Sequence, residues 1–192
     1  MIVLPRRTLL RWLTAMALCL AALCGAAQAQ QNDETGMQLA AQERPGILET
    51  VRGILGYVRW PGDPNPIRLC VLGSNAPAAK LLAASMADLG ERKVQMLQPT
   101  SEIGIGQRCD AVFVAANSAL SWRKVLEQIS GQPVLSLCER SPACTTGSMF
   151  YLDISPQDHV QFEVDIDAVA RSSVRVNPQV LRLGRRPGGR TS

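Results

Sequence analysis

The sequence predicts an α/β fold: a mainly parallel sheet with flanking helices, closed by a C-terminal antiparallel hairpin and stapled by disulfides. Three apolar runs, at residues 67–72, 110–115 and 133–137, lack the alternation of a half-buried strand, which indicates strands buried on both faces. Helical patterns separate these runs. Strands that alternate with helices form parallel sheets with right-handed crossovers, so this order favours one sheet covered on both sides.

The first 29 residues have the features of an export signal. Three arginines precede an apolar segment at residues 12–25, and Ala27-Gln28-Ala29 provides a small-x-small cleavage site. A membrane anchor is the alternative, but the apolar segment is shorter than the roughly 20 residues that a span needs. We therefore expect residues 1–29 to be a cleaved signal peptide and the protein to be exported.

The charge of the exported chain gives no indication of nucleic-acid binding. The whole chain carries 20 basic and 16 acidic residues, and loss of the three signal arginines lowers the formal net charge from +4 to +1. Residues 30–40 are polar, and residues 185–192 combine arginine with glycine and proline, so both segments are expected to be flexible. Residues 41–184 then form a single domain large enough for its own core.

The first half of the domain begins with a helix, predicted over 39–57 or shortened if Pro45 sets its first turn. Tyr57 and Trp60 are expected on one face of this helix, which Pro61 ends. The strand at 67–72 leads into the Gly73-Ser74-Asn75 turn. The elements expected next are a helix from Pro77 to Gly90, a short strand at 93–97, a loop at 100–108 and the strand at 110–115.

The second half changes from parallel to antiparallel character. Ser118 is expected to cap a helix whose apolar face is Trp122, Val125, Leu126 and Ile129, and the strand at 133–137 follows. Ser155-Pro156-Gln157-Asp158 is a turn signal between apolar-alternating segments, which predicts a hairpin. Its strands are expected at 149–154 and 160–164, followed by a helix at 166–172 and a closing helical turn through Val180, Leu181 and Leu183.

Four cysteines follow the predicted signal: Cys70, Cys109, Cys138 and Cys144. An even number in an exported protein favours disulfides. A bridge between Cys70 and Cys109 would join neighbouring strands, and one between Cys138 and Cys144 would close a short loop. Zinc is the alternative, but the spacing matches no common zinc pattern and the only histidine is His159.

No catalytic constellation is apparent, so we expect no enzyme, no cofactor and no metal. His159 lies at the predicted hairpin tip, no Gly-x-Ser-x-Gly motif is present, and Gly104-Ile105-Gly106 lacks the third glycine of a dinucleotide fingerprint. Gly73-Ser74-Asn75 could hold an anion against a helix start, with a plain strand-to-helix turn as the alternative. A periplasmic small-solute-binding module is thus an alternative function, through this turn or through an aromatic pocket around Tyr57 and Trp60.

The order of several short motifs resembles the YfiR family (DUF4154). They are Tyr57-x-x-Trp60-Pro61, Leu69-Cys70-Val71-Leu72-Gly73, Cys109-Asp110 and Pro133-Val134-Leu135, with Phe162-Glu163-Val164-Asp165, Ala168-x-x-Arg171-Ser172 and Leu181-Arg182-Leu183 closing the chain. The likeness extends from about residue 48 to residue 183, and the order and spacing of the motifs carry it more than any single one.

The resemblance implies a periplasmic negative regulator without catalysis. Such a protein binds and represses an inner-membrane diguanylate cyclase of the YfiN type, which lowers cyclic di-GMP and biofilm formation. An outer-membrane lipoprotein of the YfiB type sequesters the repressor and releases the cyclase. The resemblance also implies a homodimer.

The same resemblance locates the cyclase-contacting region in the hairpin and the helix after it, with Phe150, Glu163, Val169 and Arg171 as partner-binding residues. Phe162 is expected to face the core, so Glu163 must point the other way. A surface ion pair between Glu163 and Arg171 is the alternative role for these two charges. The corner at Tyr57 and Trp60 is the second candidate for the contact surface.

Overall fold

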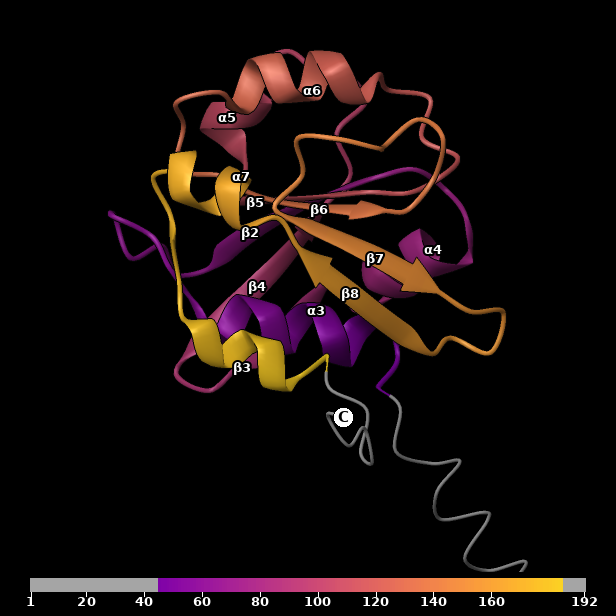
Figure 1. Cartoon of the computed structure of the whole chain (residues 1–192), viewed down its shortest axis with the longest axis horizontal. Coiled ribbons are helices and arrows are strands. Elements are labelled where there is room, and N and C mark those ends of the chain that lie inside the picture. The colour runs from indigo at the N-terminus through magenta and orange to yellow at the C-terminus, as the bar shows by residue number, and fades with distance from the viewer. Residues whose placement is uncertain (1–44, 185–192) are drawn as a thin grey trace, which may run out of the picture. The chain divides into compact units, whose positions relative to one another are not determined.

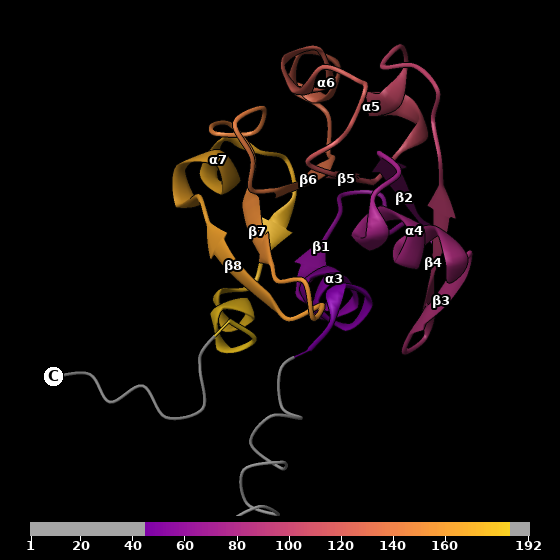
Figure 2. The ribbon, with the colours of Figure 1, turned by 90° about the vertical axis from the view of Figure 1, so that its right-hand side faces the viewer.

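The computed structural model describes residues 45–184, which form a curled seven-stranded sheet with helices on both faces (Figures 1 and 2). The strand order is β3-β4-β2-β5-β6-β7-β8. The five inner strands run parallel, whereas the edge strands β3 and β8 are antiparallel to their neighbours. The bounds are β2 Ile67–Leu72, β3 Met86–Leu89, β4 Arg92–Leu97, β5 Ala111–Val114, β6 Leu135–Glu139, β7 Phe150–Ile154 and β8 Val160–Val164.

Helices cover the two faces of this sheet in two groups. Residues of α3 and α4 belong to one hydrophobic cluster, and residues of α5 and α6 belong to another on the opposite face. A small second sheet pairs β1 with β9. The bounds are α3 Ile47–Gly56, β1 Val58–Arg59, α4 Ala76–Ala83, α5 Ile105–Arg108, α6 Trp122–Ile129, α7 Ile166–Arg171, β9 Arg175–Val176 and the 3₁₀ helix η1 Pro178–Arg182.

The central strands supply both clusters because successive side chains point to opposite faces. In β2, Leu69 and Val71 belong to the cluster beneath α3 and α4, whereas Cys70 and Leu72 belong to the cluster beneath α5 and α6. All four side chains are buried. The predicted α/β class and the strands buried on both faces are therefore confirmed.

The C-terminal hairpin also forms as predicted. Leu152 lies opposite Phe162, and Tyr151 lies opposite Glu163. This register keeps Phe162 on the core side of β8, and it turns Glu163 outward. The hairpin thus completes the sheet and presents one charged face to solvent.

The helix predicted from Pro77 to Gly90 forms only in its first half. Helix α4 ends at Ala83, Ser85 adopts a positive φ of 43°, and Met86–Leu89 forms β3. Gly90, with a φ of 64°, is in the turn that joins β3 to β4 rather than at a helix end. The chain turns back here because β3 can then form hydrogen bonds with the backbone N–H and C=O groups on the free edge of β4.

Tyr57 and Trp60 do not share a helix face. Helix α3 ends at Gly56, and Val58 and Arg59 form β1, which pairs with β9 near the end of the domain. Pairing with a distant segment overrides the local helical pattern here. At its other end, α3 begins at Ile47 after Pro45 and Gly46, which agrees with the shorter of the two predicted helices.

Two smaller predictions also change. Ser121, not Ser118, occupies the N-cap of α6, and the segment predicted as a loop at 100–108 contains α5. The predicted signal peptide and the flexible segments at 30–40 and 185–192 lie outside the described residues. Within residues 45–184, no helix is both long and apolar enough to cross a membrane.

Candidate functional site

Both predicted disulfides are present. Cys70 and Cys109 have their Cα atoms 5.8 Å apart, and Cys138 and Cys144 have theirs 6.4 Å apart, within the usual range for a bridge. The first bridge joins β2 to the segment just before β5, so it ties two central strands together. The second closes the loop between β6 and β7, at the edge of the same apolar cluster.

Trp60 is a structural residue rather than a surface anchor. Its side chain is only 6% exposed, and the indole Nε1 donates a hydrogen bond of 2.8 Å to the backbone carbonyl of Asp110. The carboxylate of Asp110 in turn accepts bonds of 3.0 and 2.8 Å from the Arg68 guanidinium. This hydrogen bonding raises the pKa of Arg68 above its ordinary value. The corner therefore locks the start of β2 against β5.

Tyr57 differs from Trp60 because it remains partly exposed. It lines a cavity of about 450 Å³ together with Arg59, Arg175 and Asn177, where the end of α3 meets β9. Only this half of the predicted Tyr57–Trp60 corner is accessible to a ligand or a partner.

The Gly73-Ser74-Asn75 turn does not present free amides to an anion. The side-chain oxygen of Asn117 accepts hydrogen bonds of 3.2 Å from the backbone N–H groups of both Ser74 and Asn75. The Asn75 side chain caps α4 and also donates to the Glu139 carboxylate. The plain strand-to-helix turn, which was the alternative interpretation, fits this arrangement.

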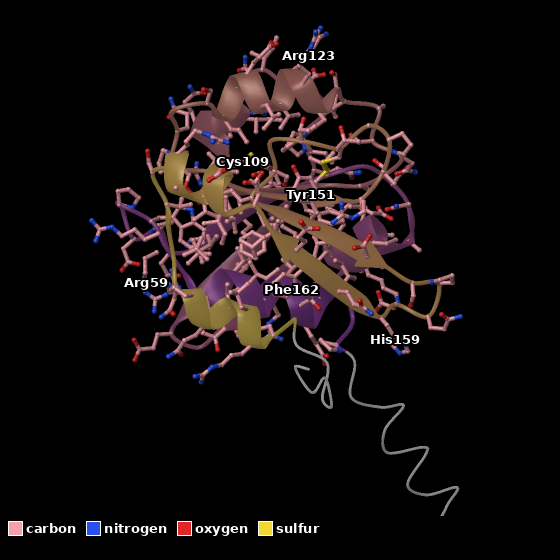
Figure 3. The ribbon with its side chains drawn as sticks, viewed as in Figure 1. Arg59, Cys109, Arg123, Tyr151, His159 and Phe162 are labelled. Carbon is pink, nitrogen blue, oxygen red and sulfur yellow. A yellow bond between two sulfur atoms is a disulfide. The ribbon has the colours of Figure 1, made fainter. Side chains whose placement is uncertain are left out.

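Phe150 lies in the core, so it cannot contact a partner directly. Its side chain has no exposed surface, and its ring centroid lies 5.7 Å from that of Phe162. The reason is the register of β7, which turns Phe150 to the α3 face of the sheet, where the two rings pack together. Figure 3 shows Phe162 below the hairpin and His159 at the far end of the hairpin, away from Tyr151.

Glu163 is exposed, and its ion-pair partner is Arg140 rather than Arg171. The Arg140 Nη2 atom donates to a Glu163 carboxylate oxygen at 2.7 Å, and Arg140 Nε donates to Asp153 at 3.0 Å. The guanidinium also lies over the Tyr151 ring. Partial burial lowers the pKa of Arg140, but Glu163 and Asp153 outweigh it and raise the pKa overall. Glu163 is thus held in a fixed position across three strands.

The other two predicted partner-binding residues, Val169 and Arg171, lie on different sides of helix α7. At 100° per residue, Val169 and Arg171 lie about 160° apart around the helix, with the buried Ala168 between them. Val169 is on the same side as Ile166, whose side chain is 63% exposed. Arg171 points to the other flank, and it makes no ion pair with any residue in the range 45–184.

The accessible part of the predicted contact region is smaller than expected, because Phe150 is buried. It also includes Ile166, which the sequence analysis did not identify. We use the term β8–α7 surface for Glu163, Ile166 and Val169. Ile166 could have been recognised as an apolar residue directly after a helix N-cap. Arg140 could not, because only the pairing of β6, β7 and β8 brings it to Glu163.

The described residues around this surface were compared with the side-chain groups that bind metal ions. Among residues 45–184, no group of three or more histidine, cysteine, aspartate or glutamate side chains is placed to hold a metal ion. The single histidine lies at the end of the hairpin turn, where its backbone N–H donates to Ser155.

The model of the YfiR/HmsC-like family (DUF4154) matches residues 48–185, well over half of the chain and almost all of the described domain. The chain belongs to the YfiR/HmsC-like family. This family is regulatory rather than catalytic, and it acts on cyclic di-GMP signalling from the periplasm. The family match covers every strand of the sheet, both disulfides and the β8–α7 surface.

Proposed function

We propose that this YfiR/HmsC-like protein is a periplasmic repressor that binds the periplasmic part of an inner-membrane diguanylate cyclase of the YfiN type. Repression lowers cyclic di-GMP and biofilm formation, and a YfiB-like outer-membrane lipoprotein relieves it by sequestering the repressor. The observation that carries this proposal is the family match across almost all of the described domain. The protein acts as a homodimer in this proposal.

The β8–α7 surface is the proposed contact site on the repressor. Partner-binding surfaces concentrate a few anchors and fix them in place before binding. Ile166 provides an exposed aliphatic side chain, and Glu163, three residues earlier, is already oriented by Arg140. Phe150 contributes from inside, because its ring packs against Phe162 of β8.

A pull-down with the periplasmic region of the cyclase tests the contact. Glu163→Lys places a second cation beside Arg140, so it should lower retention of the cyclase at least tenfold. The exposed pair contributes at most about 1 kcal/mol, so the melting temperature should change by only a few degrees. Gln161→Lys is the matched control, because Gln161 is exposed and lies two residues away on the same face of β8.

The same strain provides the cellular measurement. Deletion of the gene should raise cyclic di-GMP, and the Glu163→Lys variant should reproduce that increase while Gln161→Lys does not. Unchanged cyclic di-GMP in the deletion strain would refute the proposed function. If cyclic di-GMP rises in the deletion strain but the Glu163→Lys variant still represses fully, the cyclase contact does not include the β8–α7 surface.

A small-solute-binding role is the second candidate, and the cavity at Tyr57 favours it. This cavity combines one aromatic side chain with Arg59 and Arg175. A thermal-shift screen with periplasmic solutes should then give a saturable rise in melting temperature that Tyr57→Ala removes. The Gly73-Ser74-Asn75 turn is not part of this candidate site, because Asn117 already accepts bonds from its amides.

A further inference from the structure

Strand β8 forms one edge of the sheet, and Figure 2 shows it beside β7 at the end of the sheet. Directly after β8, the N–H of Asp165 donates a bond of 3.0 Å to the carbonyl of Met149. Residues that bond to one neighbour alternate along an antiparallel strand, so every second residue before Asp165 also faces β7. The backbone groups of Val160, Phe162 and Val164 therefore face away from the sheet.

Most of these outward backbone groups are unpaired. The N–H of Val160 donates a bond of 3.2 Å to the carbonyl of Pro45, which covers one end of the edge. The backbone N–H and C=O groups of Phe162 and Val164 have no hydrogen-bond partner within residues 45–184. A row of unpaired N–H and C=O groups is a template for a further strand. The edge of β8 therefore has unused capacity for main-chain hydrogen bonds.

Strand β8 lacks the features that usually protect such an edge. Proteins protect edge strands with proline, lysine or a β-bulge, or by covering the edge with another part of the chain. The residues of β8 include neither proline nor lysine, and their pairing with β7 continues without a bulge. The opposite edge of the sheet differs, because the Arg52 side chain donates a hydrogen bond to the Asp88 carbonyl of β3. The unprotected edge of β8 indicates that a strand binds there.

The side chains around β8 determine which segment fits the edge. Phe162 and Val164 are partly buried and pack against the core cluster, so apolar side chains of an added strand would extend this face. Glu163 lies on the other face, where it shares Arg140 with a second carboxylate. Residues 150–171 carry five carboxylate side chains but only one arginine and no lysine. Opposite charges on neighbouring strands stabilise a sheet, so apolar residues that alternate with lysine or arginine match this edge.

We propose that the free edge of β8 binds an extended segment of the cyclase's periplasmic part as an additional strand of the sheet. The backbone of that segment bonds to Phe162 and Val164, and a lysine or arginine of the segment lies beside Glu163. In strand addition, main-chain hydrogen bonds provide affinity and the alternating side chains provide specificity. This inference rests on the proposed function, and it specifies how the cyclase contacts the β8–α7 surface.

Two variants of Val164 separate backbone contacts from side-chain contacts in the cyclase pull-down. Val164→Pro and Val164→Ala both change the side chain, but only proline removes the outward N–H. An edge strand tolerates proline where the N–H faces away from the sheet, and the melting temperature of each variant checks folding. Val164→Pro should lower retention of the cyclase at least about tenfold relative to Val164→Ala. Equal retention by the two folded variants would overturn strand addition and leave the proposed function standing.

Amide hydrogen exchange of the wild-type protein is a second measurement, and it needs no variant. In the free protein, the amides of Phe162 and Val164 should exchange faster than those of Gln161 and Glu163, which bond to β7. Saturation with the periplasmic region of the cyclase should slow exchange at Phe162 and Val164 at least about tenfold. Unchanged exchange at both residues in the saturated complex would overturn the proposal.

The basic residue beside Glu163 and the occupant of the edge have separate outcomes. Glu163→Gln should make cyclase retention less sensitive to salt than in the wild type, and equal salt sensitivity would exclude a lysine or arginine beside Glu163. Absence of retention by the wild-type protein would refute the proposed function and this occupant together. If Val164→Pro converts a homodimer to a monomer but retains the cyclase as Val164→Ala does, the edge joins two copies of this chain, and the proposal is wrong.

Discussion

The two disulfides should differ in their contribution to stability, because they close loops of very different length. Replacing both cysteines of a bridge by alanine removes the loop constraint on the unfolded chain. The sequence separation is 39 residues for Cys70–Cys109 and 6 residues for Cys138–Cys144. In the chain-entropy description, these separations correspond to about 4 and about 2 kcal/mol of stabilisation. The long bridge should therefore contribute about 2 kcal/mol more than the short one.

The local cost of the substitutions is well matched between the two pairs. All four cysteines are at most 1% exposed, and all belong to the same apolar cluster. Each double variant thus loses two buried sulfur atoms from similar surroundings. The difference in the free energy of unfolding between the two variants therefore reflects mainly the different lengths of the closed loops. The measurement is urea unfolding of the oxidised wild-type protein and of the two double-alanine variants.

The difference should also appear as a melting temperature about 5–10 °C lower for the Cys70/Cys109 variant than for the Cys138/Cys144 variant. Equal stability of the two variants, or greater loss on removing the short bridge, would contradict the loop-length argument. The cost would then lie in the packing of the β6–β7 loop rather than in the unfolded chain.

Two further predictions concern single residues. Gly73→Ala should lower the free energy of unfolding by more than about 1 kcal/mol in urea titrations, because Gly73 has a φ of 130° and an added Cβ would lie 2.5 Å from that of Ala115. The pKa of Glu102 is lowered by hydrogen bonds from its own backbone N–H and from that of Ser121. The ionised Glu102 carboxylate therefore stabilises the fold at pH values above its ordinary pKa of 4.5. This stabilisation is lost as the pH falls through the lower pKa that Glu102 has in the folded protein. NMR titration should show the Ser121 amide moving with the Glu102 carboxylate, and a Glu102 pKa at or above 4.5 would contradict this.

Local patterns were sufficient where burial decides the structure. The apolar runs at 67–72, 110–115 and 133–137 contain β2, β5 and most of β6, since a segment that is apolar on both faces is stable only inside a covered sheet. The hairpin of β7 and β8 followed from alternation around a turn signal, and both disulfide pairings followed from strand proximity and loop length.

Local patterns failed where a distant segment completes an edge. The residues after Gly56 continue a helical pattern, but β9 pairs with them as β1. Likewise, β3 replaces the end of a predicted helix because β4 provides hydrogen-bonding groups that only a neighbouring strand can satisfy. Neither partner is visible in the window of sequence that sets the local pattern.

The α/β class, the paired cysteines and the family could be predicted from the residues alone, because burial and spacing constrain residue type. Which side chains are available to a partner depends on the folded arrangement. It buried Phe150 and Trp60, paired Glu163 with Arg140, and turned Arg171 toward a cavity. The physical reason is that exposure and ion pairing depend on the register between strands and on the rotation of α7, which bring together residues far apart in the chain.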